Sequence, residues 1–178
     1  MNTAEKGYRN GQADLTELEK SEQKLFNETM ELTQEQKDVL KTNVTELEYM
    51  LEQRLAHIEG EEKSMNKAKG SVDDFEGIIK EADDTVKKDL EDLKTAVNRR
   101  YELHSAFVSE YKQLATLQKE LYAMLVAKTT KLTELRDKVD EVNAKNEKVE
   151  STVIAFNDST EKVNVMKDDI FSSLKNEE

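Results

Sequence analysis

Apolar residues recur at alternating steps of three and four along three long stretches of the chain. These stretches run over residues 40–79, 86–125 and 132–174. A spacing of 3.5 residues places side chains on one narrow stripe of a helix, here called the seam, and favours left-handed supercoiling around a partner helix. The pattern therefore predicts three long helices, at about residues 34–80, 84–127 and 131–175.

A shorter apolar pattern precedes the three long stretches. Four leucines in it lie at seam spacing: Leu15, Leu18, Leu25 and Leu32. They predict an additional helix over about residues 13–32, whereas residues 1–12 have no apolar pattern and are predicted to form a flexible tail. The connections between the long helices are only a few residues long, which makes neighbours antiparallel. We therefore predict an all-α fold: an elongated, spectrin-like, up-down-up three-helix bundle with a short N-terminal helix added, in one domain over residues 13–178.

Three glycines lie inside the first long stretch: Gly60, Gly70 and Gly77. Each disfavours a helix by about 1 kcal/mol relative to alanine. Ser71 and Asp74 could also begin a new helix after Gly70. Because the seam keeps its phase across this point, we predict one continuous helix that bends here.

The composition of the chain permits these long helices and excludes several kinds of functional site. The chain contains no proline, the strongest helix breaker. It contains no cysteine, which excludes disulfides, zinc–thiolate sites and cysteine nucleophiles. No apolar run approaches the ~20 residues needed to cross a bilayer, and the first residues lack the apolar region of a signal peptide. We expect no cofactor and no metal, since the chain has neither a glycine-rich phosphate loop nor a His-x-x-x-His pattern.

The chain is strongly acidic, with 27 basic and 39 acidic residues and a net charge of −12. No segment is basic, so the positive surface that a nucleic-acid-binding protein needs is missing. An acidic surface also repels anionic lipid. The charge therefore argues against a nucleic-acid partner and against direct adsorption to a membrane.

Two polar layers are predicted inside the bundle. When the long helices are aligned by their connections, Glu61 lies level with His104. A second layer contains three residues at one level: Arg54, Tyr111 and Asn146. Buried polar groups need hydrogen-bond partners, and polar seam residues fix register, so we interpret both layers as structural. The alternative for the first layer is a metal cluster that also includes His57 and Glu62.

Two tyrosines beside the seam, Tyr101 and Tyr122, are candidate binding residues together with Arg100. Tyrosine suits interfaces and sugar surfaces because it is flat, rigid and amphipathic, so one interpretation is that Tyr101, Tyr122 and Met124 are partly exposed and available for binding. The alternative, which the usual width of an apolar helix stripe favours, is that these side chains widen the core.

Acidic pairs such as Asp83-Asp84 and Asp168-Asp169 occur along the chain. Paired carboxylates hydrolyse bonds only in a cleft that shifts their pKa values, and here charge and spacing indicate solvated helix faces. Neither histidine has a serine placed on a strained turn. We predict no catalytic residue and interpret the protein as a non-enzyme.

Three groups of residues, spread over about residues 17–174, carry a resemblance to a known family. They are Arg100-Tyr101; Lys119-Glu120-Leu121-Tyr122-Ala123-Met124-Leu125; and Phe156-Asn157 with Thr160, Asn164, Lys167 and Phe171. In these residues the chain resembles the cell-wall-binding lipoprotein family (YkyA-like) of Gram-positive bacteria. Where such proteins often have a tyrosine one turn after Thr160, this chain has Val163.

The resemblance implies an extracytoplasmic protein held at the outer face of the membrane by a lipid. Such proteins are made with a lipoprotein signal and a lipid-modified cysteine; neither is in this sequence, so the resemblance implies that both were removed from a longer precursor. It also implies binding to a wall polymer or a surface protein. Teichoic acids are polyanionic and would be repelled by a charge of −12, which leaves peptidoglycan or a protein as the partner.

Two other functions stay open at this point. One is a generic coiled-coil scaffold whose partner is another helix, and the other is a cell-wall hydrolase. The apolar stripe of residues 13–32 could dock on its own bundle or on a second copy, which would give a homodimer.

Overall fold

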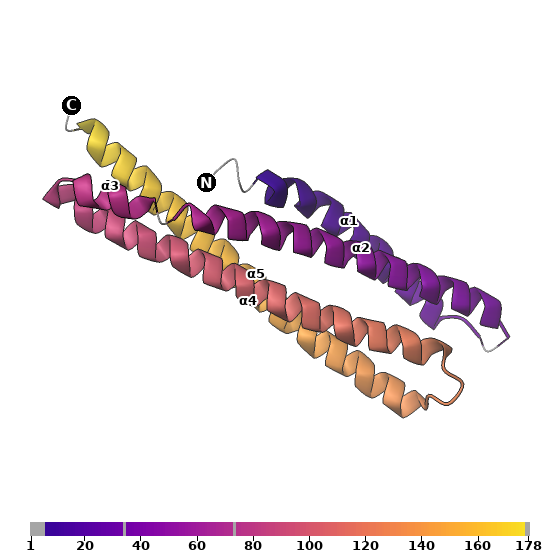
Figure 1. Cartoon of the computed structure of the whole chain (residues 1–178). Coiled ribbons are helices and arrows are strands. Elements are labelled where there is room, and N and C mark those ends of the chain that lie inside the picture. Colours follow the sequence, from indigo (N-terminus) through magenta and orange to yellow (C-terminus); the bar gives the residue numbers. More distant parts are fainter. Residues whose placement is uncertain (1–5, 34, 73, 177–178) are drawn as a thin grey trace.

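The chain folds entirely into helices over the residues that the structure describes. A computed structural model describes residues 6–33, 35–72 and 74–176. Its helices are, in order, α1 Lys6–Met30, α2 Lys37–Gly70, α3 Phe75–Glu81, α4 Asp84–Val126 and α5 Leu132–Asn176 (Figure 1). The prediction of an all-α fold is confirmed.

The helices form a rod of two layers. α2 and α4 pack against each other, with the short α3 also on α4; α1 packs on α2 and α5 packs on α4. In Figure 1, α1 and α5 both lie behind the layer made by α2 and α4. The connections are short, so consecutive long helices run antiparallel. With its 45 residues, α5 is about 68 Å long at 1.5 Å per residue.

The rod has two halves that differ in composition. The half that contains the connections at residues 31–36 and 127–131 is built from α1, α2, α4 and α5 and is called the four-helix half. The opposite half contains the link between α2 and α3, and is called the α3 half. α1 begins near the middle of the rod and does not reach the end that carries α3 (Figure 1).

The N-terminal helix is longer than predicted. α1 begins at Lys6 and has 25 residues, so the boundary expected at residue 13 is wrong, and residues 6–12 of the predicted tail are helical. Residues 1–5 lie outside the described residues. Gly7 and Gly11 disfavour a helix by about 1 kcal/mol each, but without proline nothing stops a helix from extending through them.

The helix predicted over residues 34–80 is broken. α2 ends at Gly70 and α3 begins at Phe75, so the continuous helix is wrong and the new helix after Gly70 is correct. In between, the N–H groups of Ser71 and Val72 bond to carbonyls three residues earlier, at 3.1 and 2.9 Å, in tight turns. Glycine and serine favour such turns over a helix interior. The seam survives because Val72 and Ile79 are still buried on either side of the break.

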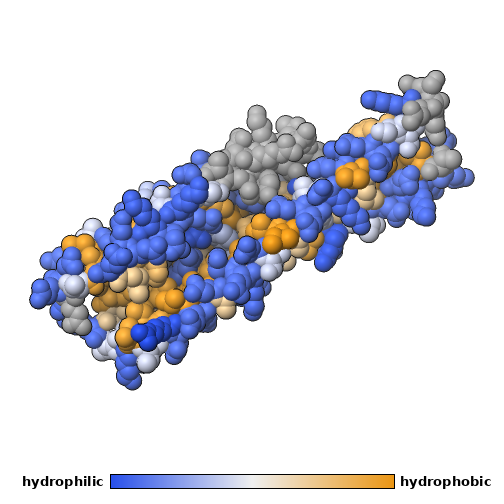
Figure 2. All heavy atoms as spheres, turned by 180° about the vertical axis from the view of Figure 1, so that it is seen from behind, coloured by the Kyte–Doolittle hydropathy of each residue, from blue (hydrophilic) through white to orange (hydrophobic). Residues whose placement is uncertain are grey.

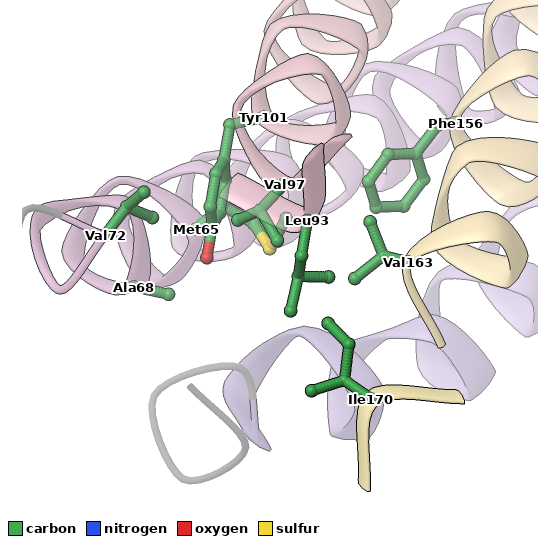
Figure 3. Packing of buried hydrophobic residues seen from close by; sticks show 9 residues of the cluster. All are labelled: Met65, Ala68, Val72, Leu93, Val97, Tyr101, Phe156, Val163 and Ile170. Atoms are coloured by element: carbon green, nitrogen blue, oxygen red, sulfur yellow. The ribbon is translucent and has the colours of Figure 1, made fainter. Parts of the chain in front are cut away.

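Apolar side chains, all but Tyr101 at seam positions, form the core of the α3 half. Figure 3 shows nine of them meeting from α2, α4, α5 and the link after α2: Met65, Ala68, Val72, Leu93, Val97, Tyr101, Phe156, Val163 and Ile170. Burying such side chains contributes about 25 cal/mol for each Å² removed from water. The core of the four-helix half contains seam residues such as Val44, Leu47 and Leu51 in the same way, but a charged cluster lies beside it.

Candidate functional site

Arg54 of α2 lies at the centre of a buried polar cluster in the four-helix half. Its side chain is buried and reaches toward α4 and α1. Its Nε donates a hydrogen bond to the Tyr111 hydroxyl at 2.8 Å, and one terminal nitrogen donates to the Glu22 carboxylate at 2.6 Å. The same nitrogen lies 3.3 Å from the Gln118 side-chain oxygen. The guanidinium therefore joins three helices.

α1 contributes the acidic part of this cluster. One oxygen of Glu22 accepts from Arg54, and the other accepts a short hydrogen bond from the Tyr122 hydroxyl. Glu19, one turn earlier, accepts from the Tyr111 hydroxyl at 2.7 Å and lies 3.7 Å from Arg54. Together these residues are called the Arg54 cluster: Glu19, Glu22, Arg54, Tyr111, Gln118 and Tyr122.

The electrostatics of the Arg54 cluster depend on complete pairing. Burial alone would lower the pKa of Arg54, but the oxygens of Tyr111 and Glu22 raise that pKa above its ordinary value. Burial raises the pKa of the Tyr111 and Tyr122 hydroxyls, so both keep their protons and donate them. Among the described residues, no buried side-chain nitrogen or oxygen lacks a hydrogen-bond partner. Such pairing offsets the cost of burying charge.

A groove of about 300 Å³ opens next to the Arg54 cluster. Its walls are α1 and α5, and its floor comes from α2 and α4. The lining residues are Glu19, Glu22, Gln23, Phe26, Arg54, Gln118, Leu121, Tyr122, Val139, Val142, Asn143 and Asn146. Seen from behind, apolar residues are visible between hydrophilic ones in this half of the rod (Figure 2). The groove thus combines carboxamides with aliphatic and aromatic side chains.

The predicted second polar layer is only partly assembled. The structure brings Arg54 and Tyr111 together, but Asn146 is exposed on the groove wall, and within the described residues no hydrogen bond joins it to either of them. Glu22 is the third partner instead, and sequence reasoning missed it. A signal was present: positions 15, 18, 22, 25, 29 and 32 alternate steps of three and four, and Glu22 fills one of them.

The first polar layer contains Glu61 and His104. The His104 Nε2 lies 3.1 Å from a Glu61 oxygen, and both side chains are buried. Phe107 and Phe156 flank the imidazole with ring centroids at 6.0 and 5.3 Å. His57 is half-buried one turn before Glu61, and both line a shallow pocket between α1 and α2. No group of three or more His, Asp and Glu side chains that could hold a metal occurs in the described part of the chain.

The candidate binding residues are buried. Arg100, Tyr101 and Tyr122 keep only 4%, 2% and 2% of their surface accessible, so the two tyrosines widen the core and the interpretation that they are partly exposed is wrong, whereas Met124 is half-buried. The Nε of Arg100 donates to the Thr160 hydroxyl at 2.8 Å, and its guanidinium lies 5.0 Å from the Phe156 ring centroid. Tyr101 belongs to the apolar cluster of the α3 half, whereas Glu22 and Phe26 of α1 lie against Tyr122. The apolar stripe of α4 is thus wider than its seam. Tyr122 still lines the groove from within the Arg54 cluster.

No described helix is long and apolar enough to cross a membrane.

The arrangement offers a groove with hydrogen-bonding walls, and the buried carboxylate of Glu22 is held by Arg54 and Tyr122. Sequence reasoning also missed the groove residues Gln118 and Asn143. Gln118 occupies a seam position of α4 and Asn143 follows the seam residue Val142, but isolated polar residues at such positions are common on helices and indicate no groove by themselves.

Comparisons with known proteins agree with this architecture. Residues 1–173 match the family described as "Putative cell-wall binding lipoprotein" (YkyA). The chain is 30% identical over 175 residues to an uncharacterised lipoprotein, YkyA, of Bacillus subtilis (strain 168). The alignment covers 96% of this chain and 77% of that protein. A crystal structure of a conserved protein of unknown function from Staphylococcus aureus has the same fold, with a TM-score of 0.79 and 21% identity over 95% of this chain and 85% of the other. The family match spans nearly the whole sequence, which confirms the resemblance: the chain belongs to the YkyA family of lipoproteins.

Proposed function

We propose that this protein is a non-enzymatic component of the cell envelope that binds a wall polymer or a surface protein through the groove between α1 and α5. The observation that carries the proposal is the groove itself, which exposes carboxamides beside apolar side chains. Concave sites of this mixed character suit recognition of neutral polar ligands. The family description as cell-wall binding supports the same conclusion.

The state of the carboxylates supports binding rather than hydrolysis. A glycoside hydrolase needs one carboxylic acid that donates a proton and a second carboxylate that acts as base or nucleophile. In this groove Glu22 accepts two hydrogen bonds from buried donors, and Glu19 accepts one from Tyr111. Both groups hold α1 in place. A cell-wall hydrolase is therefore the weaker alternative.

We place the native protein outside the cytoplasm, held to the membrane by a lipid on a cysteine that is not in this sequence. The lipoprotein family supports this placement. The precursor gene tests it: a lipobox cysteine upstream of residue 1 is expected. A gene that encodes neither a lipoprotein signal nor such a cysteine would overturn the placement and would favour a scaffold inside the cell.

A pull-down with purified cell-wall sacculi tests the binding function. We expect the protein to sediment with sacculi equally at low and high salt, because a groove of amides and apolar groups depends little on screening. Loss of binding at high salt would contradict recognition by this groove. Release of soluble muropeptides from the sacculi would contradict the non-enzymatic function.

A second candidate is a scaffold that pairs with another helix, including a second copy of this chain. Ile154 and Val165 of α5 are 53% and 52% exposed and lie 11 residues, or about three turns, apart on one face. Sedimentation velocity tests this alternative: a dimer that dissociates when both residues are changed to serine favours the scaffold.

A further inference from the structure

The groove contains amide groups that the fold leaves unused. Asn143 and Asn146 of α5 are exposed on one wall, and neither forms a hydrogen bond to another residue in the described part of the chain. Gln118 on the floor accepts from Arg54 through its oxygen, which leaves its NH₂ group available. Each carboxamide offers donors and an acceptor on one rigid plane. The wall can therefore pair with both the C=O and the N–H of another amide.

Apolar side chains lie directly beside these amides. Phe26 of α1 and Val139 and Val142 of α5 line the same groove, and Leu121 lies on its floor. A ligand that hydrogen-bonds to the asparagines would therefore also place a small apolar group against this surface. Acetamido and alanyl groups carry a methyl group next to an amide, so they offer a hydrogen-bonding group and a small apolar group side by side, as the groove does.

The charge of the groove excludes anions. Its ionisable lining residues are Glu19, Glu22 and Arg54, which sum to −1, and the whole chain carries −12. Arg54 is buried: its Nε and one terminal nitrogen bond to Tyr111, Glu22 and Gln118, and its other terminal nitrogen lies 3.7 Å from the Glu19 carboxylate. An anionic ligand would thus meet acidic groups with no free cation among them. The part of the ligand that enters the groove therefore carries no negative charge.

We propose that the groove between α1 and α5 binds an uncharged secondary amide with an adjacent methyl group, as found in N-acetylated sugars and in alanine-containing peptides. The inference rests on the proposed function and names the chemical class that its groove would take. Asn143 and Asn146 pair with the ligand amide, and Phe26 with Val142 receives the methyl side.

A bound ligand would also connect two helices whose backbones stay apart. No Cα atoms of α1 and α5 approach within 8 Å among the described residues. A molecule in contact with both walls would hold α1 against the bundle in addition to the Glu22–Arg54 contact. Hydrogen exchange of the α1 backbone would then slow when the ligand is present.

Titrations with small probes followed by NMR test the proposal on the whole chain. N,N′-diacetylchitobiose and N-acetyl-alanyl-alanine methylamide carry the secondary amide, whereas cellobiose carries none and deacetylated chitobiose is cationic. We expect at least one amide probe to shift the side-chain NH₂ resonances of Asn143 and Asn146 and to slow exchange in α1. The probe that binds more tightly identifies the source as sugar or peptide. Equal binding of cellobiose or of deacetylated chitobiose overturns the proposal.

A pair of matched variants separates the groove from the rest of α5. Asn143→Ala with Asn146→Ala removes the wall amides at exposed positions, and we expect about tenfold weaker binding of the probe. Asn157→Ala with Asn164→Ala makes the same change on the same helix outside the groove and leaves binding unchanged. Equal affinity of both variants overturns the proposal.

The same variants distinguish this inference from the proposed function. If sacculi bind wild type and both variants alike, the amide-binding groove is wrong while wall binding stands. If the amide probe binds and the groove variant loses it, but sacculi do not bind, the groove assignment stands and the wall function is wrong.

Discussion

Both halves of the rod bury apolar seam residues, but only the four-helix half adds the Arg54 cluster beside them. In the α3 half, Leu93, Val97 and Val163 pack in an apolar cluster. In the four-helix half, the level of Arg54 is occupied by a guanidinium, two carboxylates and two tyrosine hydroxyls. Apolar packing contributes stability and accepts many combinations of side chains. A buried ion pair adds little net stability and requires specific partner residues. The comparison indicates that apolar packing holds both halves of the rod together, whereas the Arg54 cluster of the four-helix half also positions α1 beside a groove.

The largest effect is expected from removing the central cation. Arg54→Met leaves the buried Glu22 carboxylate without its charged partner, which costs about 3–5 kcal/mol of unfolding free energy. Urea denaturation measures the loss. Arg99→Met is the control, because Arg99 is exposed and pairs only with Glu102 at the surface, so the change is within about 1 kcal/mol.

A double variant sharpens this result. Glu22→Met combined with Arg54→Met removes both charges and should recover much of the lost stability, since apolar replacements of buried pairs are often neutral. If the double variant is as unstable as Arg54→Met alone, the Glu22–Arg54 pair is not the source of the effect.

A truncation in the apolar half should cost slightly less. Leu93→Ala removes a buried side chain from the cluster in Figure 3 and should lower the unfolding free energy by about 3 kcal/mol, within the usual range for leucine. Leu132→Ala, at a position that is 64% exposed, should change it by less than about 0.5 kcal/mol. Similar losses at both positions would contradict the packing described for the α3 half.

Alkaline pH should destabilise the four-helix half. The pKa values of Tyr111 and Tyr122 are raised in the folded state above the ordinary 10.0, so their stabilisation is complete below about pH 10 and is lost as pH rises further. Each tyrosine contributes up to about 1.4 kcal/mol per pH unit in that range. Urea midpoints between about pH 9 and about pH 11 measure this slope. Replacing both tyrosines with phenylalanine should flatten it, and an unchanged slope would show that other groups are responsible.

The smallest effect is expected at the glycines of α2. Gly60 lies inside the helix, and an added Cβ would meet nothing within 4 Å, so Gly60→Ala should raise the unfolding free energy by about 1 kcal/mol. Gly70 is the last residue of α2 and has the same free space, so its replacement should stabilise less. An equal or larger gain at Gly70 would indicate that this glycine, rather than the following turn, ends α2. Thermal unfolding compares the two variants.

Register between the long helices could be predicted because it depends on short connections. Alignment across the hairpin between α3 and α4 places Glu61 beside His104 and Arg54 beside Tyr111, and the structure has both pairs in contact. The role of Glu22 could not be found in this way. α1 joins α2 through a longer connection than the one between α3 and α4, and it contributes few large apolar side chains. Its register therefore depends on polar contacts, which the spacing of apolar residues does not predict.

The spacing of apolar residues by itself determined that this protein is a set of long helices, because a 3.5-residue period and the absence of proline permit little else. Only the tertiary structure decided where the helices stop and what lies between them. The burial of Arg100 depends on α5, and the groove beside Arg54 depends on how α1 and α5 lie on the α2–α4 layer. Local spacing records which side of a helix is apolar, whereas a groove arises from the distance between helices that are far apart in the chain.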